Sequence, residues 1–431
     1  MLSAPSVLPR AWLTVALLWV VGCLNYLDRV MITTMRGSVL ETIPMTEAQF
    51  GLLTTIFLWV YGGLSPFAGF LADRLSRTRV IVASLLIWSL VTWLTAHAKT
   101  FEQLFVTRAL MGVSEACYIP AALALIADYH RGNTRSLANG IHLCGALFGS
   151  SLGGLGGWMA ERQGWQFAFS LFGGVGVAYA LVLQFFLRDA PAEPAAEPAG
   201  AATAPPVDSA GAAERIRLGA ALASLLARRA FLIALAYWGL LGLAGWALIG
   251  WMPSYLGEHF HLAQGRAGLF ATGFSNGAMI VGMLMGGVWA DRWSRTNERA
   301  RIFVPMIGLC VAAPCVWLVS ITPVLPVALA GLAVYGLARA FADGNMMPIL
   351  CTISDPRYRA TGYGILNFFG TLVGGAAIYV GGRLRDGHVE VSRMFQFAAG
   401  GLGLCVLLLA LLKPQPAPAA PVVARTPQKV L

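Results

Sequence analysis

Charged residues are scarce in this sequence. Asp, Glu, Lys and Arg together make up 12% of its 431 residues, whereas hydrophobic residues make up 57%. A soluble domain carries roughly 25% charged residues, and the mean hydropathy of this chain is +0.69. So few charges cannot cover a water-exposed surface of this size. The composition therefore excludes an ordinary soluble protein and indicates that most of the chain contacts lipid.

Patterns typical of enzymes, metal sites and disulfides are also missing. The sequence has no HExxH, no Walker loop and no GxSxG in a turn, the motifs that would carry hydrolytic or phosphoryl-transfer chemistry. Apolar stretches hold all seven cysteines, and no pair of them shares a polar loop: Cys23, Cys117, Cys144, Cys310, Cys315, Cys351 and Cys405. We therefore expect no enzyme activity, no catalytic residues, no bound metal and no cofactor.

Apolar runs of about 20 residues recur along almost the whole chain, and each is long enough to cross a hydrocarbon core of roughly 30 Å as an α-helix. None of them shows the alternation of a transmembrane β-strand. The sequence predicts an all-α membrane protein with twelve transmembrane helices. The predicted spans are 11–33, 49–71, 79–97, 101–127, 135–158, 166–188, 229–256, 266–289, 300–320, 324–352, 360–383 and 392–413.

A polar segment divides the chain in two. Between Leu187 and Leu218 the sequence is rich in Pro, Ala, Glu and Gly, a composition typical of a flexible linker. We predict an N-terminal six-helix half over 10–190, a cytoplasmic linker over 191–227, a C-terminal six-helix half over 228–413 and a cytoplasmic tail over 414–431.

The distribution of basic residues predicts the orientation. The net charge is +10, and most of the 30 Lys and Arg residues lie in loops and termini on one side of the predicted spans. Because cytoplasmic loops carry the excess of basic residues, we expect both termini in the cytoplasm of a bacterial-type inner (plasma) membrane. Topology thus explains the positive charge without nucleic-acid binding, and we expect a monomer in the lipid bilayer.

The two predicted halves repeat one another in sequence. GFLADRLSRTR at Gly69–Arg79 matches GVWADRWSRTN at Gly287–Asn297. At one constant offset, an acidic residue and a proline of span 101–127 also match those of span 324–352: Glu115 and Pro120 match Asp343 and Pro348. Many transporters are built from two such repeats, with the substrate site between them near the bilayer midplane.

The GxLADRxxRxR pattern at Gly69–Arg79 is similar to the cytoplasmic loop motif of the major facilitator superfamily, and the resemblance covers residues 10–413. It implies the major facilitator fold, two six-helix pseudo-repeats. In that family the Asp of the motif lies near a helix terminus of the opposite half, pairs with an Arg and latches the cytoplasmic side shut. Such an interaction contributes about 1–2 kcal/mol.

The resemblance implies this gating role for Gly69, Asp73, Arg74, Arg77, Asp291, Arg292 and Arg295. The alternative is a solvated loop that only follows the rule for cytoplasmic charge.

Glycines at four-residue spacing mark span 135–158, at Gly145, Gly149, Gly153 and Gly157. Small residues at this spacing let two helix backbones approach closely, so we interpret them as a packing face. The stretch GALFGSSLGG also approximates the antiporter motif of the same superfamily, with Ser150 where that motif has Pro. An export signature is therefore the alternative.

Ionisable residues inside the spans are expensive to bury, so a functional site is the default interpretation. Burial favours the neutral form of a carboxyl group and a neighbouring Arg favours the charged form, which makes the acidic residues candidates for carrying protons. An Arg can bind a carboxylate or phosphate through two parallel hydrogen bonds. An ion-pair network that only holds helices together is the alternative. The residues are Asp28, Arg29, Arg108, Glu115, Arg339 and Asp343.

NYLDR at Asn25–Arg29 and RALMGVSEACY at Arg108–Tyr118 resemble the anion:cation symporters and the related Spinster-type lipid transporters. In these groups the acidic residues at Asp28 and Glu115 carry protons, and the Arg at Arg29 binds the anionic group of the substrate. WMPSYLGEHF at 251–260 favours the symporters, whereas GLLTTIFLWVYGGLSPFAGFLADR at 51–74 favours the Spinster type.

We therefore predict proton-coupled secondary active transport of a small organic anion, a sugar acid or carboxylate, by alternating access. A Spinster-like (lyso)lipid transporter or a proton-driven exporter is the alternative. Asp28 and Glu115 are the predicted proton-coupling residues. The predicted substrate-binding residues are Arg29, Tyr26, Tyr61, Arg108, Asn367, Arg339 and Asp343.

Overall fold

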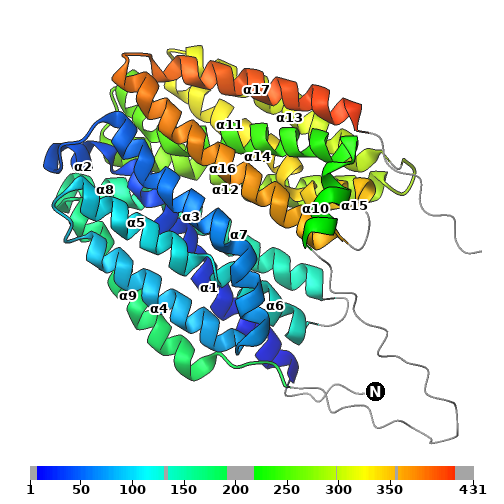
Figure 1. Ribbon diagram of the computed structural model, residues 1–431. Helices are drawn as coiled ribbons and strands as arrows, with labels where there is room; N and C mark the ends of the chain where they lie inside the picture. Colours follow the sequence, from blue (N-terminus) through cyan, green and yellow to red (C-terminus); the bar gives the residue numbers. More distant parts are fainter. Residues whose placement is uncertain (1–6, 131–133, 192–217, 298, 355–357, 413–431) are drawn as a thin grey trace, which may run out of the picture.

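The computed structural model describes residues 7–130, 134–191, 218–297, 299–354 and 358–412, and the regular structure in these segments is helical (Figure 1). The first half contains α1 (Val7–Thr34), α2 (Arg36–Thr42), α3 (Glu47–Arg74), α4 (Arg77–Thr95), α5 (Phe101–Glu115), α6 (Tyr118–Tyr129), α7 (Arg135–Leu152), α8 (Gly154–Gln163) and α9 (Trp165–Phe186). After α10 (Leu218–Leu226), the second half contains α11 (Arg229–His259), α12 (Gln264–Trp293), α13 (Ala300–Ile321), α14 (Leu325–Gly344), α15 (Met346–Ile353), α16 (Arg359–Asp386) and α17 (Val391–Leu411).

Eleven helical segments in the described residues are long and apolar enough to cross a membrane. The predicted span 135–158 is not among them; it is divided at Gly153 into α7 and α8. The all-α membrane class is confirmed. The predicted linker and tail fall largely on 192–217 and 413–431, outside the described residues, and α10 occupies the end of the predicted linker. The division into halves at that linker stays a prediction.

Two predicted spans break at equivalent places because of equivalent prolines. A proline lacks an N–H, and its ring clashes with the carbonyl of the residue four positions earlier in a helix. Pro120 stands four residues after Ala116, the C-cap of α5, and Pro348 stands four residues after Gly344, the last residue of α14. The repeated prolines thus place an acidic residue, Glu115 or Asp343, at the end of a helix inside each half.

Glycines bring α7 and α8 against α1. A Cβ atom at Gly145 would lie 2.5 Å from the carbonyl oxygen of Trp19, and one at Gly149 would lie 1.9 Å from that of Cys23. On α8, a Cβ at Gly157 would lie 2.6 Å from the carbonyl oxygen of Thr34. Real side chains do not fit at such distances, so the structure confirms the interpretation of this glycine series as a packing face.

Gly149→Ala should lower the thermal unfolding midpoint of the purified protein, because overpacking of such a contact costs about 1–3 kcal/mol. Gly140→Ala on the same helix is the matched control, since no atom lies within 4 Å of a Cβ built there. Thermal unfolding in detergent measures both variants. Equal midpoints for the two would contradict the close approach of α7 to α1.

The two halves meet at the end of the molecule that holds α2 and α8, and separate toward the end that holds α6 and α15 (Figure 1). We call these the α2 end and the α6 end. Polar side chains join the halves at several points. Thr55 on α3 donates to the carbonyl of Gly375 on α16 at 2.7 Å, and Thr272 on α12 donates to the carbonyl of Ser151 on α7 at 2.8 Å.

Four charged residues close the α2 end in what we call the ion-pair ring. Arg36 of the first half pairs with Glu47 of its own half and, at 3.0 Å, with Glu258 of the second half. Arg385 of the second half pairs with Glu258 at 2.7 Å and with Glu47 at 3.4 Å. Separation of the halves breaks two of these pairs and leaves one Arg–Glu pair within each half. The ring can therefore open without leaving any of its charges unpaired.

Removing both carboxylates of the ring, by Glu47→Gln together with Glu258→Gln, should favour the state that is open at the α2 end. Exposed ion pairs contribute about 0.2–1 kcal/mol each, so loss of the two pairs between the halves should shift the population roughly 2- to 30-fold. A cysteine at Ser254, which lines a pocket beside Arg36 and Glu258, reports this opening through its labelling rate in a chain without the native cysteines.

Glu41→Gln is the control for this measurement, because Glu41 is exposed on α2 and lies outside the ring. Unchanged labelling in the double variant would show that the ring does not hold the halves together.

Two residues of the predicted latch at the α6 end, Arg77 and Asp291, form ion pairs within their own halves. Arg77 pairs with Asp128 and donates to the carbonyl of Ala124 at 2.8 Å, all within the first half. Arg301 pairs with Asp291 at 3.5 Å within the second half. The physical reason is that the halves are separated at this end. Gly69 and Asp73 lie on the last turns of α3, the side chain of Asp73 is outside the described part of the structure, and the gating role of the motif stays a prediction.

Candidate substrate and proton site

A cavity of about 250 Å³ lies between the halves, lined by α1 and α3 on one side and by α11, α14 and α16 on the other. We call it the central cavity. It brings together most of the residues predicted to bind substrate, although they come from distant parts of the sequence: Tyr26, Arg29, Tyr61, Arg339, Asp343 and Asn367. Arg108 is not among the residues that line it.

Arg29 is the cation that the first half presents to this cavity. Its Nη2 donates to Oε2 of Glu115 at 2.8 Å and to Oδ1 of Asn25 at 3.2 Å. The side chains of Arg29 and Glu115 are 3% and 0% exposed. The break before Pro120 places Glu115 at the end of α5, and a four-residue spacing places Asn25 one turn before Arg29 on α1.

Aromatic rings surround the guanidinium of Arg29. Its Cζ lies 4.5 Å from the centre of the Tyr61 ring, 4.6 Å from that of Tyr26 and 4.9 Å from that of Phe57. Cation–π contacts of this kind contribute about 0.5–2 kcal/mol when they are desolvated. The three rings limit the orientations that the guanidinium can adopt. Tyr26 and Tyr61 also line the central cavity.

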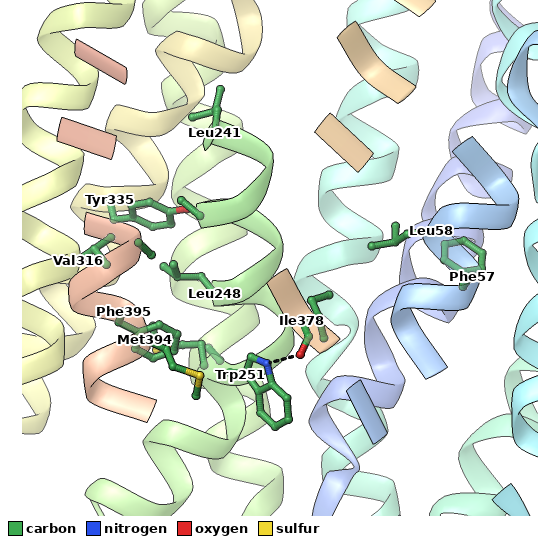
Figure 2. Close-up of a cluster of buried hydrophobic side chains, with 14 of the residues drawn as sticks. Phe57, Leu58, Leu241, Leu248, Trp251, Val316, Tyr335, Ile378, Met394 and Phe395 are labelled. Atoms are coloured by element: carbon green, nitrogen blue, oxygen red, sulfur yellow. Dashed lines mark hydrogen bonds between the residues drawn. The ribbon is translucent and has the colours of Figure 1, made fainter. Parts of the chain in front are cut away.

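Phe57 was missed by the sequence analysis, although a signal was present. It stands four residues before Tyr61 on α3, a spacing that puts two side chains on one face of a helix. The two rings stack at 6.0 Å, and Phe57 also lies 5.0 Å from the guanidinium of Arg108 (its side chain is labelled in Figure 2). One ring therefore contacts two buried arginines, Arg29 and Arg108.

Arg108 is buried behind α1. It donates to the backbone carbonyls of Asp28 and Arg29, at 3.5 Å each, and to the sulfur of Met111 at 3.1 Å. It has no carboxylate partner among the described residues. The structure thus places Arg108 as a support that connects α5 to α1, and its predicted contact with substrate stays a prediction.

Asp28 has few donors around it. The hydroxyl of Thr92 on α4 donates to its Oδ2 at 3.4 Å, and its Oδ1 has no hydrogen-bond partner among the described residues. The residue is 2% exposed and does not line the central cavity. In apolar surroundings a carboxyl oxygen without a hydrogen-bond donor is costly to bury in the ionised form.

The second half presents a second Arg–carboxylate pair. On α14, Nε of Arg339 donates to Oδ2 of Asp343 at 3.2 Å, and Nη1 donates to the hydroxyl of Tyr335 at 3.0 Å. The three residues are spaced four apart on one helix, so the pair satisfies itself along α14. Figure 2 shows Tyr335 on α14 with its hydroxyl directed toward α11. Tyr335 was missed by the sequence analysis, and the same spacing was the available signal.

The comparison with protein families identifies the chain. A family model described as Major Facilitator Superfamily matches residues 18–378. This chain belongs to the Major Facilitator Superfamily. The resemblance read from the loop motif is confirmed, and the protein is a multi-pass membrane transporter of small molecules and not an enzyme.

Known members of the superfamily align with much of the chain. An MFS-type efflux pump of Mycolicibacterium smegmatis is 26% identical over 409 residues, 93% of this chain and 89% of that protein. A protein of Cupriavidus necator named "Probable sulfoacetate transporter SauU" is 29% identical over 292 residues, 66% of each chain. Protein spinster homolog 1 of Homo sapiens is 32% identical over 186 residues, 42% of this chain and 35% of that protein.

Solved structures show the same fold. A bacterial homolog of the human lysosomal transporter Spinster, in an inward-facing and unoccupied conformation, superimposes with a TM-score of 0.73 at 21% identity, over 94% of this chain and 95% of that one. Together with the sequence relatives, this confirms the predicted resemblance to Spinster-type members and the major facilitator fold.

Arg29→Lys should weaken the binding of an organic anion about tenfold or more, although the charge is kept. A lysine ammonium cannot reproduce the two parallel hydrogen bonds of a guanidinium or its stacking on tyrosine rings. Titration calorimetry of the purified variant with the transported anion measures the affinity. Arg393→Lys is the control for replacing an arginine by a lysine, because Arg393 is an exposed residue of α17. An unchanged affinity in Arg29→Lys would exclude the anchor role.

Proposed function

We propose that this transporter carries a small organic anion, such as a sugar acid or another carboxylate, in symport with protons by alternating access. The observation that carries the proposal is the position of Arg29, a buried guanidinium that nevertheless lines the cavity between the halves. A permanently charged group with paired donors suits a carboxylate or sulfonate. The relative named for sulfoacetate transport supports an organic anion as the substrate.

Coupling to protons follows from competition for one guanidinium. A substrate anion that binds both terminal nitrogens of Arg29 displaces Glu115, which lies 2.8 Å from Nη2. Glu115 is 0% exposed, and a buried carboxylate that loses its ion-pair partner is strongly destabilised. Glu115 therefore takes up a proton as the anion binds. When the anion and the proton leave together, Glu115 returns to Arg29.

Asp28 is the second proton carrier in this proposal. It lies next to Arg29 in sequence but contacts α4, so its protonation does not require a change in the cavity wall. Its unpartnered Oδ1 has room for a proton. The two acids thus differ in role: Glu115 exchanges its proton against the substrate, and Asp28 takes part without contact to the substrate.

We further propose a monomer in a bacterial-type inner membrane with both termini in the cytoplasm. The α2 end is then the outer end, and the closed ion-pair ring marks the conformation that is closed to the outside. The loop motif around Asp73 would close the cytoplasmic end in the alternate conformation.

A Spinster-like lipid carrier or a proton-driven exporter is the second candidate, favoured by a neighbouring pocket of about 130 Å³. That pocket shares Tyr26 and Arg339 with the central cavity and lies between α7 and α12, and most of its wall is apolar: Leu147, Leu248, Ile249, Met252, Met279 and Leu332. Counterflow of a labelled lysophospholipid into proteoliposomes, compared with that of a labelled carboxylate, separates the two candidates.

Glu115→Gln should abolish accumulation of the anion driven by a pH gradient, whereas exchange of labelled for unlabelled anion should continue. The amide imitates the protonated acid permanently, so Arg29 is free for the anion but no proton is taken up or released. Both activities are measured in one preparation of proteoliposomes, corrected for the amount of folded protein.

A purely structural ion pair predicts a different result, namely lower thermal stability with parallel loss of exchange and accumulation. Asp28→Asn provides the comparison for the second acid, and we expect it to lose accumulation as well. Full accumulation in Glu115→Gln would exclude Glu115 as the obligatory proton carrier.

A further inference from the structure

A glycine on α11 makes room for the guanidinium of Arg339. A Cβ atom at Gly245 would lie 2.1 Å from Nη1 of Arg339 and 2.5 Å from both Cζ and Nη2. The guanidinium therefore lies directly against the α11 backbone, in the volume that a side chain at Gly245 would occupy. Its bonds to Asp343 and Tyr335 fix it there from the α14 side. Any side chain at position 245 would push the guanidinium away from the wall.

Arg29 and Arg339 approach the central cavity from opposite halves, and both line it. The hydrogen bonds of Arg29 to Asn25 and Glu115 both run from Nη2, which leaves Nη1 available to a ligand. Nη2 of Arg339 makes no hydrogen bond within the described part of the chain. Each guanidinium is also paired with one carboxylate of its own half, Glu115 or Asp343. The cavity thus offers two equivalent places for an anionic group.

We propose that the substrate is a compact dianion, which places one anionic group on Arg29 and the other on Arg339, and that Gly245 is the positioning residue that keeps Arg339 against the wall. This inference rests on the proposed function and narrows its substrate class. A cavity of about 250 Å³ limits the spacer between the two anionic groups to a few atoms. A dianion that binds both arginines also connects α1 to α14, and so holds the two halves together around itself.

The charge balance of the site agrees with a dianion. Binding to both arginines displaces Glu115 and Asp343, and each displaced carboxylate takes up one proton. The protons on Glu115 and Asp343 balance the two negative charges of the substrate, and the proton on Asp28 adds one net positive charge to the step. A monoanion displaces only one carboxylate and leaves the other Arg–carboxylate pair in place. Accumulation of the dianion should therefore respond to a pH gradient and, through the proton on Asp28, also to a membrane potential.

The experiment is uptake of acetate, malonate, succinate and adipate into proteoliposomes with an imposed pH gradient. Wild-type protein should transport malonate or succinate with a KM about tenfold or more below that for acetate, because a second charge-assisted contact is made. Arg339→Gln should raise the KM for the dianions about tenfold or more and that for acetate far less.

Gly245→Ala tests the positioning role without removing a charge. We expect it to raise the KM for succinate more than that for malonate, at a turnover number close to that of the wild type, because the displaced guanidinium shortens the cavity. Gly277→Ala on α12 is the matched control, since no atom lies within 4 Å of a Cβ there. A stability effect alone would lower the amount of active protein and leave both KM values unchanged.

Equal KM values for acetate and the dianions in the wild type would contradict the inference that the substrate is a dianion. An equal change in these KM values in Arg339→Gln would contradict it as well. Either result would be compatible with the proposed symport of an organic anion. Identical KM values in Gly245→Ala and Gly277→Ala would overturn the positioning role of Gly245. Absence of uptake for every anion would overturn both this inference and the proposed function.

Discussion

The rest of the site depends on the buried pair of Arg29 and Glu115. In surroundings without water, an ionised side chain that loses its partner costs several kcal/mol, so this pair cannot simply separate. It can only be exchanged for another arrangement in which the charges are again satisfied. A substrate anion on Arg29 together with a proton on Glu115 is such an arrangement. In the mechanism we propose, the same energetic cost couples the binding of the anion to the protonation of Glu115.

The second half repeats the design with a different geometry. Pro120 and Pro348 break equivalent helices and leave Glu115 and Asp343 near equivalent helix ends. In the first half the carboxylate pairs with an arginine from another helix and the pair is almost fully buried. In the second half, Arg339 and Asp343 lie on one helix and are 12% and 22% exposed. The pair on α14 is therefore the easier one for a ligand to open.

In the ion-pair ring, too, each charge keeps a partner of opposite sign when the arrangement changes, here when the two halves separate. Each half contributes one arginine and one glutamate, and each half retains a neutral pair when the ring opens. An exposed ring of this kind stabilises closure by only a small free energy. That suits a gate which must open in every cycle, whereas the glycine contacts of α7 and α8 with α1 pack the helices of the first half closely together.

The sequence by itself determined the membrane environment, the helical class, the superfamily and the charged residues that line the central cavity, because hydropathy, buried charge and a repeated motif are local properties of the chain. Spacing along one helix could also have revealed Phe57 and Tyr335. Only the tertiary structure showed that Arg108 donates hydrogen bonds to backbone carbonyls of α1 and that the guanidinium of Arg339 packs against Gly245. It also showed which charged residues form the ion-pair ring. Those contacts join residues far apart in sequence, and they depend on how whole helices and halves pack, which no local pattern encodes.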